Sequence, residues 1–351
     1  MKTPNLILII AIIFIGFANL YKINEEYGHY LKGEVEIKDS DILQMYMQYL
    51  EQYKSKKFDV NRDMDRFEIF KDRVRMIINH NLDTTKTWKM GISHITDLTM
   101  EEINQSYRVM EPQECSATAS PRNYYDECPP SDWDWRDKDI VSPVKDQRNC
   151  GSCWTFSTTG AMESHYKLAT GEEALLSEQE LIDCADAETY DCHGCSGGLP
   201  SYAFNFIKDK GLETENDYPY QAKDSSCRYN ATQERIITDG PFNITSGDED
   251  QLLNELYQHG PISVAFQVVD DFVHYSSGIY SSTECKSTTQ DVNHAVLAVG
   301  YGFDDQGTAY WLVKNSWSDS WGDAGYFKIE RNVNMCGIAV CNSYPLNVRK
   351  A

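Results

Sequence analysis

Gln-Arg-Asn-Cys-Gly-Ser-Cys-Trp, residues 147–154, places one cysteine at the predicted start of a helix and a second cysteine three residues before it. The first backbone N–H groups of a helix are unpaired and its dipole is positive there, so a helix start favours negative charge. A cysteine in this position can have a pKa several units below its ordinary value of about 8.5. Cys153 is therefore predicted to be a nucleophile, because the thiolate is the reactive form of a thiol.

A thiolate nucleophile also requires a base, a group that orients the base, and donors that hold an oxyanion. His294 directly precedes the apolar run Ala295–Val299, so it enters a buried strand where it can face a cleft. Asn315 ends a later predicted strand, and Trp317 beside it can shield an Asn–His hydrogen bond from water. Gln147 has a side-chain amide within reach of the helix start. His193, His259 and His274 fit surface or capping roles better, and Asn315, taken alone, fits a turn.

The charge of the chain argues against nucleic acid as a partner. The 351 residues include 54 acidic and 32 basic side chains, which gives a formal charge of −22. Phosphate binding requires basic stripes, and none is visible. The acidity fits a soluble protein, or alternatively adaptation to an acidic lumen.

The N-terminus predicts entry into the secretory pathway. Lys2 is followed by an apolar run from Leu6 to Phe17 and by small Ala18, the pattern of a signal peptide over residues 1–19. This run is too short to span a bilayer of about 30 Å, although an uncleaved anchor is the alternative. The 11 cysteines fit a compartment in which disulfide bonds form. Three Asn-X-Ser/Thr sequons are candidate glycosylation sites: Asn104, Asn230 and Asn243.

The composition changes twice along the chain. Residues 41–106 are highly charged, with apolar side chains at helical spacing. Residues 111–128 are rich in small residues and proline, which is typical of an exposed processing loop. From residue 132 onward a helical half precedes a β half, which predicts the α+β class with a cleft between two lobes. The predicted helices cover Cys153–Leu168, Ser177–Leu181 (with Ser177 as N-cap and Glu180 completing a capping box) and Ser201–Lys210. The predicted strands lie in Ile262–Val269, Ala295–Val299, Tyr310–Val313 and Tyr326–Ile329.

These motifs together resemble those of papain-like cysteine peptidases. The matching segments are Val144–Gln147, Cys150–Trp154, Cys195–Gly198, Asn293–Ala295, Lys314–Trp317 and Trp321–Tyr326, and the resemblance extends over nearly all of residues 130–351. It implies a helical left lobe and a β-barrel-like right lobe with the active-site cleft between them. It also implies that Cys153 attacks the peptide carbonyl and that His294 protonates the leaving amine. Asn315 would orient the imidazole, and Gln147 would help to hold the oxyanion.

The same resemblance implies a resting ion pair of Cys153 thiolate with His294 imidazolium. It implies substrate contacts at Gly198, Leu199, Pro200, Ala265, Val292, Asn293 and Trp317, of which Leu199, Pro200, Ala265 and Val292 would line an apolar pocket. The expected partners are peptide and protein substrates, the chain's own propeptide and cystatin-type inhibitors, with no membrane association after signal cleavage. A monomer is expected, and neither a cofactor nor a metal is.

The front of the chain, residues 20–110, resembles the inhibitory propeptide of the same family. The matching positions are Arg66, Phe70, Ile77 and Asn81 on a helix, followed by Gly91, Ser93, Ile95 and Asp97. Arg62 and Arg73 depart from the family's usual residues.

Residues 111–118 resemble the mini-chain of cathepsin H-type peptidases, which stays disulfide-bonded to the catalytic domain after maturation. Cleavage after Thr118 would leave a carboxylate facing the substrate's α-amino group, which favours removal of single N-terminal residues. The expected enzyme is thus an aminopeptidase with some endopeptidase activity, with a processing linker at 119–123 and a catalytic domain at 124–351. The alternatives are an endopeptidase that discards residues 111–118, and an inactive binding protein or propeptide-based peptidase inhibitor.

The resemblance implies the disulfide bonds Cys150–Cys195, Cys184–Cys227, Cys285–Cys336 and Cys115–Cys341, and leaves Cys153 free. Cys128 and Cys192 have no equivalent, and one interpretation pairs them with each other. Three residues near the predicted site depart from the family pattern. They are Arg148 and Ser318, which replace glycines, and Thr155, which replaces a smaller residue.

Overall fold

The computed structural model describes residues 22–108 and 128–351 and divides into two compact units. Among the described residues, unit 1 comprises 22–99 with the short segments 274–278 and 320–324. Unit 2 comprises the described residues 100–108, 128–273, 279–319 and 325–351. The predicted signal peptide (1–19), mini-chain (111–118) and processing linker (119–123) lie outside the described residues.

Unit 1 is built on two amphipathic helices, α4 (Asp39–Lys54) and α5 (Val60–Leu82). Aromatic side chains at helical spacing on each helix meet in the core, where the Phe70 ring lies 5.0 Å from Tyr46 and 4.9 Å from Tyr49. Asp59 caps α5 by accepting the backbone N–H of Asn61. The remaining elements of this unit are α2 (Lys22–Glu26), α3 (Gly28–Leu31) and β1 (Trp88–Met90).

The propeptide-like residues of unit 1 have physical roles in its packing. Asn81 donates to the carbonyl of Leu31 and both donates to and accepts from the backbone of Met90, so one amide ties α5 to β1. Arg66 donates to the carbonyl of Asp97, whose carboxylate accepts from Tyr49. β1 pairs antiparallel with Tyr275–Gly278 within the same unit.

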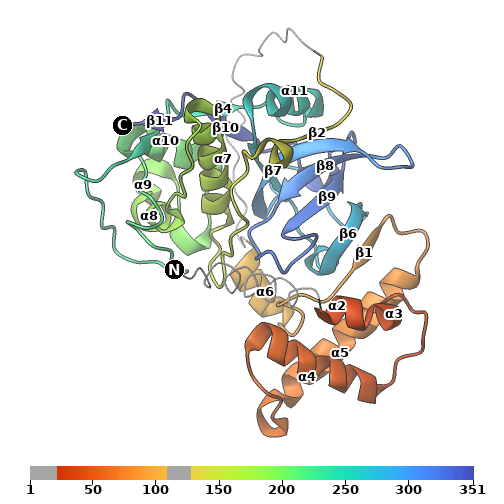
Figure 1. Cartoon of the computed structure of the whole chain (residues 1–351). Coiled ribbons are helices and arrows are strands. Elements are labelled where there is room, and N and C mark those ends of the chain that lie inside the picture. The colour runs from red at the N-terminus through yellow and green to blue at the C-terminus, as the bar shows by residue number, and fades with distance from the viewer. Residues whose placement is uncertain (1–21, 109–127) are drawn as a thin grey trace, which may run out of the picture. The chain divides into compact units, whose positions relative to one another are not determined.

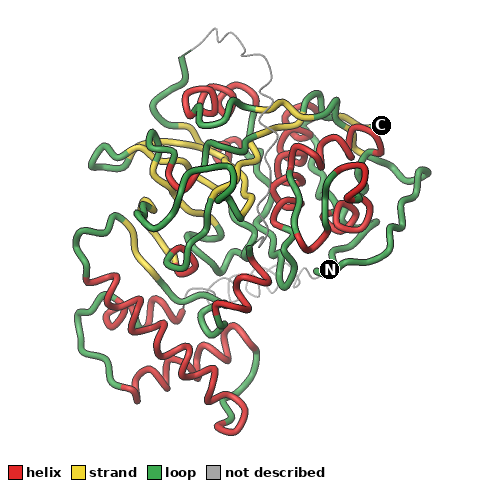
Figure 2. The backbone as a smooth tube through the Cα atoms, turned by 180° about the vertical axis from the view of Figure 1, so that it is seen from behind, coloured by secondary structure: helices red, strands yellow, loops and turns green. Residues whose placement is uncertain are grey.

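Unit 2 has most of its helices on one side and most of its strands on the other, although the helix Glu249–His259 packs beside the strands (Figures 1 and 2). Its helices are α6 (Met100–Tyr107), α7 (Cys153–Thr170), α8 (Glu178–Cys184), α9 (Ala187–Tyr190), α10 (Pro200–Lys210) and α11 (Glu249–His259). Short 3-10 turns lie at η1 (Trp135–Lys138), η2 (Gly194–Ser196), η3 (Phe272–His274) and η4 (Met335–Gly337). Ser177 caps α8 by accepting the N–H of Glu180. The Glu180 carboxylate accepts instead from Arg235 and from the N–H of Glu213.

The main sheet of unit 2 runs in the order β6-β9-β8-β7-β5-β10-β4, with β2 paired to β7. Its strands are β2 (Trp133–Asp134), β4 (Pro241–Asn243), β5 (Ile262–Phe266), β6 (Tyr275–Tyr280), β7 (His294–Phe303), β8 (Ala309–Lys314), β9 (Tyr326–Glu330) and β10 (Ser343–Pro345). β3 (Ile236–Ile237) and β11 (Arg349–Lys350) form a separate pair. The path through these strands has two ends and does not close on itself.

Helix α7 packs directly against strand β7 and so joins the helical half to the sheet. The two elements share one apolar core, and a Cβ at Gly160 would lie 3.1 Å from Leu297. Polar links reinforce the contact, because Ser157 donates to the carbonyl of Val296 and Ser263 donates to the carbonyl of Ser157. This packing fixes the first residue of α7 beside the first residues of β7.

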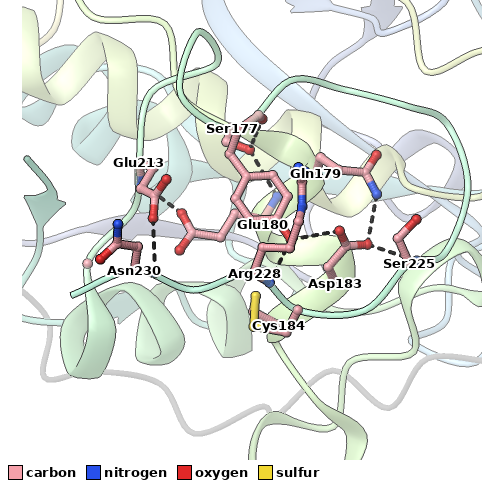
Figure 3. The surroundings of a disulfide bond; sticks show 12 residues. Ser177, Gln179, Glu180, Asp183, Cys184, Glu213, Ser225, Arg228 and Asn230 are labelled. Carbon is pink, nitrogen blue, oxygen red and sulfur yellow. Dashed lines mark hydrogen bonds between the residues drawn. A yellow bond between two sulfur atoms is a disulfide. The ribbon is translucent and has the colours of Figure 1, made fainter. Parts of the chain in front are cut away.

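Three disulfide bonds join described cysteines: Cys150–Cys195, Cys184–Cys227 and Cys285–Cys336, the same pairs that the resemblance implied. Around the second bond, Asp183 accepts from Gln179 and from the N–H of Ser225, which fixes the end of α8 to the loop that carries Cys227 (Figure 3).

The interpretation that Cys128 bonds Cys192 is wrong, because both carry free thiols. Cys128 is exposed, whereas Cys192 is buried with its sulfur 3.4 Å from the carbonyl of Tyr190. Burial raises the pKa of the Cys192 thiol to about 12.

Within residues 22–108 and 128–351, no helix combines the length and apolar character needed to cross a membrane.

Candidate active site

Cys153 is the first residue of α7 and is 1% exposed. Its sulfur accepts the backbone N–H of Ala295 at 3.4 Å, so the helix start and the start of β7 meet at the thiol. The preceding Gly151 is required by space, since a Cβ there would lie 2.4 Å from the carbonyl oxygen of Cys195. The disulfide bond of Cys150 with Cys195 thus holds the loop before the helix tightly against a neighbouring segment.

His294 and Asn315, predicted as base and orienter, are in direct contact. His294 Nε2 lies 2.8 Å from Asn315 Oδ1, and the same oxygen accepts the N–H of Ser316. The other ring nitrogen, Nδ1, is buried without a hydrogen-bond partner among the described residues. The Trp317 ring lies 4.8 Å from the imidazole and covers it. The ring is therefore oriented through one nitrogen while the second is available for proton transfer.

Gln147 is fully buried with its amide in a fixed orientation. Ser316 donates to Gln147 Oε1 at 2.7 Å, which turns the Nε2 group away from Ser316. Nε2 donates to the carbonyl of Cys150 and, at 3.1 Å, to the carbonyl of Ser106. The predicted oxyanion donor is therefore already bound to a carbonyl oxygen of the chain itself.

That carbonyl belongs to residues 100–108, here called the covering segment. Ser106, Tyr107 and Arg108 are buried in unit 2, and the Tyr107 ring contacts the edge of Trp317 at 5.5 Å. A peptide carbonyl is the group that an oxyanion donor of a peptidase must polarise. The covering segment thus places a peptide carbonyl at the amide that is predicted to hold the oxyanion.

Burial changes the proton affinities of the thiol and the imidazole in opposite directions. It raises the pKa of Cys153 to about 11, although the backbone N–H groups of Ala295, Trp154 and Cys153 partly offset this. It lowers the pKa of His294 to about 4; the bond to Asn315 opposes this shift and the nearby charge of Arg108 adds to it. Both groups are therefore neutral near pH 7 here, unlike the ion pair expected of the active enzyme.

The predicted substrate-contacting residues fall into two groups. Gly198 lies against Trp154, where a Cβ would come within 2.8 Å of the indole, and Leu199 and Pro200 begin α10. Ala265 and Val292 form a small apolar cluster with Val340, against which Cys341 packs. Asn293 uses its side chain to bond both the N–H and the carbonyl of Val268, which fixes the loop before His294.

Arg148 adopts the left-handed backbone conformation, with φ of 51°, that a glycine would adopt without strain. Its guanidinium lies over the Tyr220 ring at 5.0 Å and donates to the carbonyl of Tyr220. The Tyr220 hydroxyl donates to the carbonyl of Gln147 at 2.6 Å and lies 2.8 Å from the Ser152 hydroxyl. Tyr220 thus supports both the amide donor and the helix start. It was missed from the sequence because it lies far along the chain in an unremarkable Tyr-Pro-Tyr segment.

Ser318 and Thr155, the other two residues that depart from the family pattern, also fit the local backbone. Ser318 has φ of 66°, again the conformation of the glycine it replaces. The Thr155 hydroxyl donates to the carbonyl of Ser152 and strengthens the first turn of α7.

The predicted mini-chain residues and the candidate glycosylation sites differ in how far the structure describes them. Cys115 and Thr118 lie outside the described residues, whereas Cys341 is described and is disulfide-bonded. Among the sequons, Asn230 is on an exposed loop, Asn104 is on α6 with a buried side-chain oxygen, and Asn243 is half-buried on β4.

The fold and the arrangement around Cys153 define the class as a cysteine peptidase in precursor form. The chain belongs to the papain family, since residues 129–346 match the family described as "Papain family cysteine protease". Residues 46–103 match "Cathepsin propeptide inhibitor domain (I29)". The α+β class and the resemblance read from the sequence are therefore confirmed, and the chain carries its own propeptide inhibitor.

The sequences of known relatives match this chain over most of its length. Pro-cathepsin H of Medicago truncatula is 50% identical over 294 residues, 83% of this chain and 83% of that protein. Pro-cathepsin H of Bos taurus is 44% identical over 319 residues, 90% of this chain and 93% of that protein. The structure of digestive procathepsin L2 proteinase from Tenebrio molitor larval midgut has a TM-score of 0.80 at 34% identity and covers 87% of this chain and 99% of that one.

Proposed function

We propose that the mature enzyme hydrolyses peptide bonds through Cys153 and acts mainly as an aminopeptidase, with some endopeptidase activity. Residues 1–19 direct the chain into the secretory pathway, and residues 20–110 inhibit it until they are removed. Residues 111–118 stay attached, residues 119–123 are a processing linker, and residues 124–351 form the catalytic domain. The enzyme works as a monomer in a lysosome-like or extracellular compartment and is a target for cystatin-type inhibitors.

The chemistry assigns one task to each residue of the site. Cys153 attacks the substrate carbonyl as a thiolate, and the oxyanion accepts from the Cys153 N–H and from Gln147 Nε2. His294 then protonates the leaving amine through Nδ1, while Asn315 holds Nε2. Water hydrolyses the resulting thioester, with His294 acting as base. The 2.8 Å contact of His294 Nε2 with Asn315 supports the role of His294 as proton donor and base and the role of Asn315 as the residue that orients it.

One observation carries the aminopeptidase assignment: Cys341 is disulfide-bonded and packs against the cluster of Ala265, Val292 and Val340. Two members of this cluster are the predicted lining of the pocket before the scissile bond. A short peptide tethered to Cys341 through Cys115 would fill the cleft beyond that pocket. Its terminal carboxylate, at Thr118, would bind the substrate's α-amino group and exclude longer chains.

The proposal is tested on the full chain after acid maturation. Non-reducing mass spectrometry is expected to find residues 111–118 attached through Cys115 and Cys341. Turnover of aminoacyl and internally quenched peptide substrates is expected to stop when a thiol alkylator modifies Cys153. Turnover that survives stoichiometric Cys153 alkylation, or none after confirmed propeptide removal, would overturn the peptidase assignment. Loss of residues 111–118 with full internal cleavage would replace the aminopeptidase by a plain endopeptidase.

A further inference from the structure

Arg108, the last residue of the covering segment, is a buried cation with an incomplete set of partners. Its side chain is 9% exposed, and Nη1 lies 3.1 Å from Asp270 Oδ1. Nε and Nη2 are buried with no hydrogen-bond partner among the described residues. A guanidinium offers five donors, and burying it with one ionic partner is costly, so the contact with Asp270 must be specific.

Asp270, which accepts from Arg108, is adjacent to Asp271, and the two carboxylates differ in their hydrogen-bond partners. Asp271 is engaged, since it accepts the Tyr280 hydroxyl at 2.7 Å and lies 3.5 Å from the Ser282 hydroxyl. Asp270 has a side chain that is 71% exposed even with Arg108 bound. Asp270 is therefore the carboxylate that remains open to a ligand once the covering segment has left, while Asp271 adds negative charge behind it.

The residue that carries this cation lies close to the loop before Cys153. The Arg108 carbonyl oxygen would lie 3.5 Å from a Cβ at Gly151, two residues before Cys153. The Arg108 charge also contributes to the lowered pKa of His294. A side chain that follows the path of Arg108 thus belongs to a residue bound near the scissile bond.

We propose that Asp270, backed by Asp271, is a subsite of the mature enzyme for a lysine or arginine side chain close to the scissile bond, and that Arg108 occupies it in the precursor. This inference rests on the proposed function, because it assumes that residues 20–110 are removed from a working peptidase. Arg108 then acts in two ways: it anchors the covering segment through Asp270, and its charge disfavours the imidazolium form of His294.

The test compares mature wild-type enzyme with Asp270→Asn, Asp270→Glu and a matched control, Asp305→Asn. Asp305 lies on the exposed turn between β7 and β8, so its replacement removes the same charge elsewhere on unit 2. Quenched peptides are used that differ only by Arg, Lys, Gln or Glu at each position flanking the bond. Wild type, Asp270→Glu and Asp305→Asn are expected to prefer Arg and Lys over Gln by about 5- to 20-fold in kcat/KM at one position. Asp270→Asn is expected to lose this preference while its turnover of Gln peptides stays unchanged.

A second measurement, inhibition by a synthetic peptide of residues 100–108, does not depend on which substrates are chosen. Synthetic Met-Glu-Glu-Ile-Asn-Gln-Ser-Tyr-Arg, the sequence of residues 100–108, is expected to inhibit wild type at least 5-fold better than the same peptide with Arg108→Gln. Against Asp270→Asn the two peptides are expected to inhibit equally, which is the signature of a direct pair. Equal basic preference in wild type and Asp270→Asn, or an Arg108→Gln effect that persists in Asp270→Asn, would overturn the subsite. Absence of turnover in every variant would instead refute the proposed function.

Discussion

The carbonyl oxygen of Ser106 accepts a hydrogen bond from Gln147 Nε2 at 3.1 Å. The same amide is the predicted donor to the oxyanion, so under the proposed mechanism the Ser106 carbonyl would block the position that a substrate carbonyl needs. Burial under this form also keeps the Cys153 thiol and the His294 imidazole neutral. The proposed mechanism therefore predicts a steric and an electrostatic component of latency, both lost when the covering segment is removed.

Tyr107→Ala should weaken the hold of the covering segment. The substitution removes the ring contact with Trp317 and the apolar burial that accompanies it, which is worth about 1–3 kcal/mol. Alkylation of Cys153 in the intact precursor, followed by mass spectrometry of its peptide, is expected to accelerate about 10-fold or more. Phe303→Ala, which removes an exposed ring on β7, is the control. Equal alkylation rates in Tyr107→Ala and wild type would contradict this account of latency.

Gln147→Ala should lower kcat of the mature enzyme about 100- to 1000-fold, because it removes one oxyanion donor. Alkylation of Cys153 should persist, since the thiol and His294 are intact. Gln233→Ala, on an exposed loop, serves as the control and should leave kcat unchanged. A loss of alkylation equal to the loss of turnover would show instead that the substitution disrupts the fold.

Tyr220→Phe should reduce kcat about 3- to 10-fold with little change in KM. The substitution deletes the hydroxyl that donates to the carbonyl of Gln147, a bond worth about 1 kcal/mol, and leaves the ring beneath Arg148 in place. Tyr229→Phe, a half-exposed ring elsewhere in unit 2, is the comparison. If Tyr220→Phe raised KM and left kcat unchanged, Tyr220 would contribute to substrate binding and not to positioning of the oxyanion donor.

Acid should destabilise unit 1 through its buried histidines. Burial lowers the pKa of His274 to about 3 and that of His94 to about 4, from 6.5, and the charges of Arg73 and Lys54 respectively add to these shifts. The unfolded chain therefore binds more protons below about pH 6.5, so stability that is present above this pH is lost as the pH falls towards 4. For His274, which is 1% exposed, the loss at pH 4 is about 3 kcal/mol.

This pH dependence is measured as the Tm of the inactive Cys153→Ala precursor between pH 7 and pH 4. His274→Leu is expected to flatten the decline in Tm, because neither ring nitrogen of His274 has a described hydrogen-bond partner to lose. His193→Leu, an exposed histidine of unit 2, is the control. An unchanged slope in His274→Leu would exclude this histidine as a source of acid sensitivity.

Local sequence patterns were sufficient for the main elements. Cys153 begins a helix as expected from the segment around it, and His294 begins a strand as expected from the apolar run that follows. The contact of His294 with Asn315 depends on the pairing of β7 with β8, and both residues lie at the ends of those strands. A family resemblance supplied that long-range pairing, which neither periodicity nor spacing specifies.

Other features depend on contacts that no local pattern encodes. The left-handed backbone of Arg148 fits its replacement of a glycine, but the contact of its guanidinium with Tyr220 depends on a segment far along the chain. The free thiol of Cys192 likewise follows from burial beside Tyr190, whereas counting cysteines suggested a bond to Cys128. Pairing these two cysteines by elimination failed because Cys192 is buried and inaccessible to a partner thiol, whereas Cys128 is exposed.

The proposed specificity of this thiol peptidase depends on a peptide tethered at Cys341, which would restrict what Cys153 can cleave. The most direct measurement is the ratio of aminopeptidase to endopeptidase turnover, per active site titrated at Cys153, for mature wild type and Cys115→Ser. The ratio is predicted to fall at least 10-fold in Cys115→Ser, with internal cleavage rising as the cleft opens. Equal ratios in the two enzymes would contradict the claim.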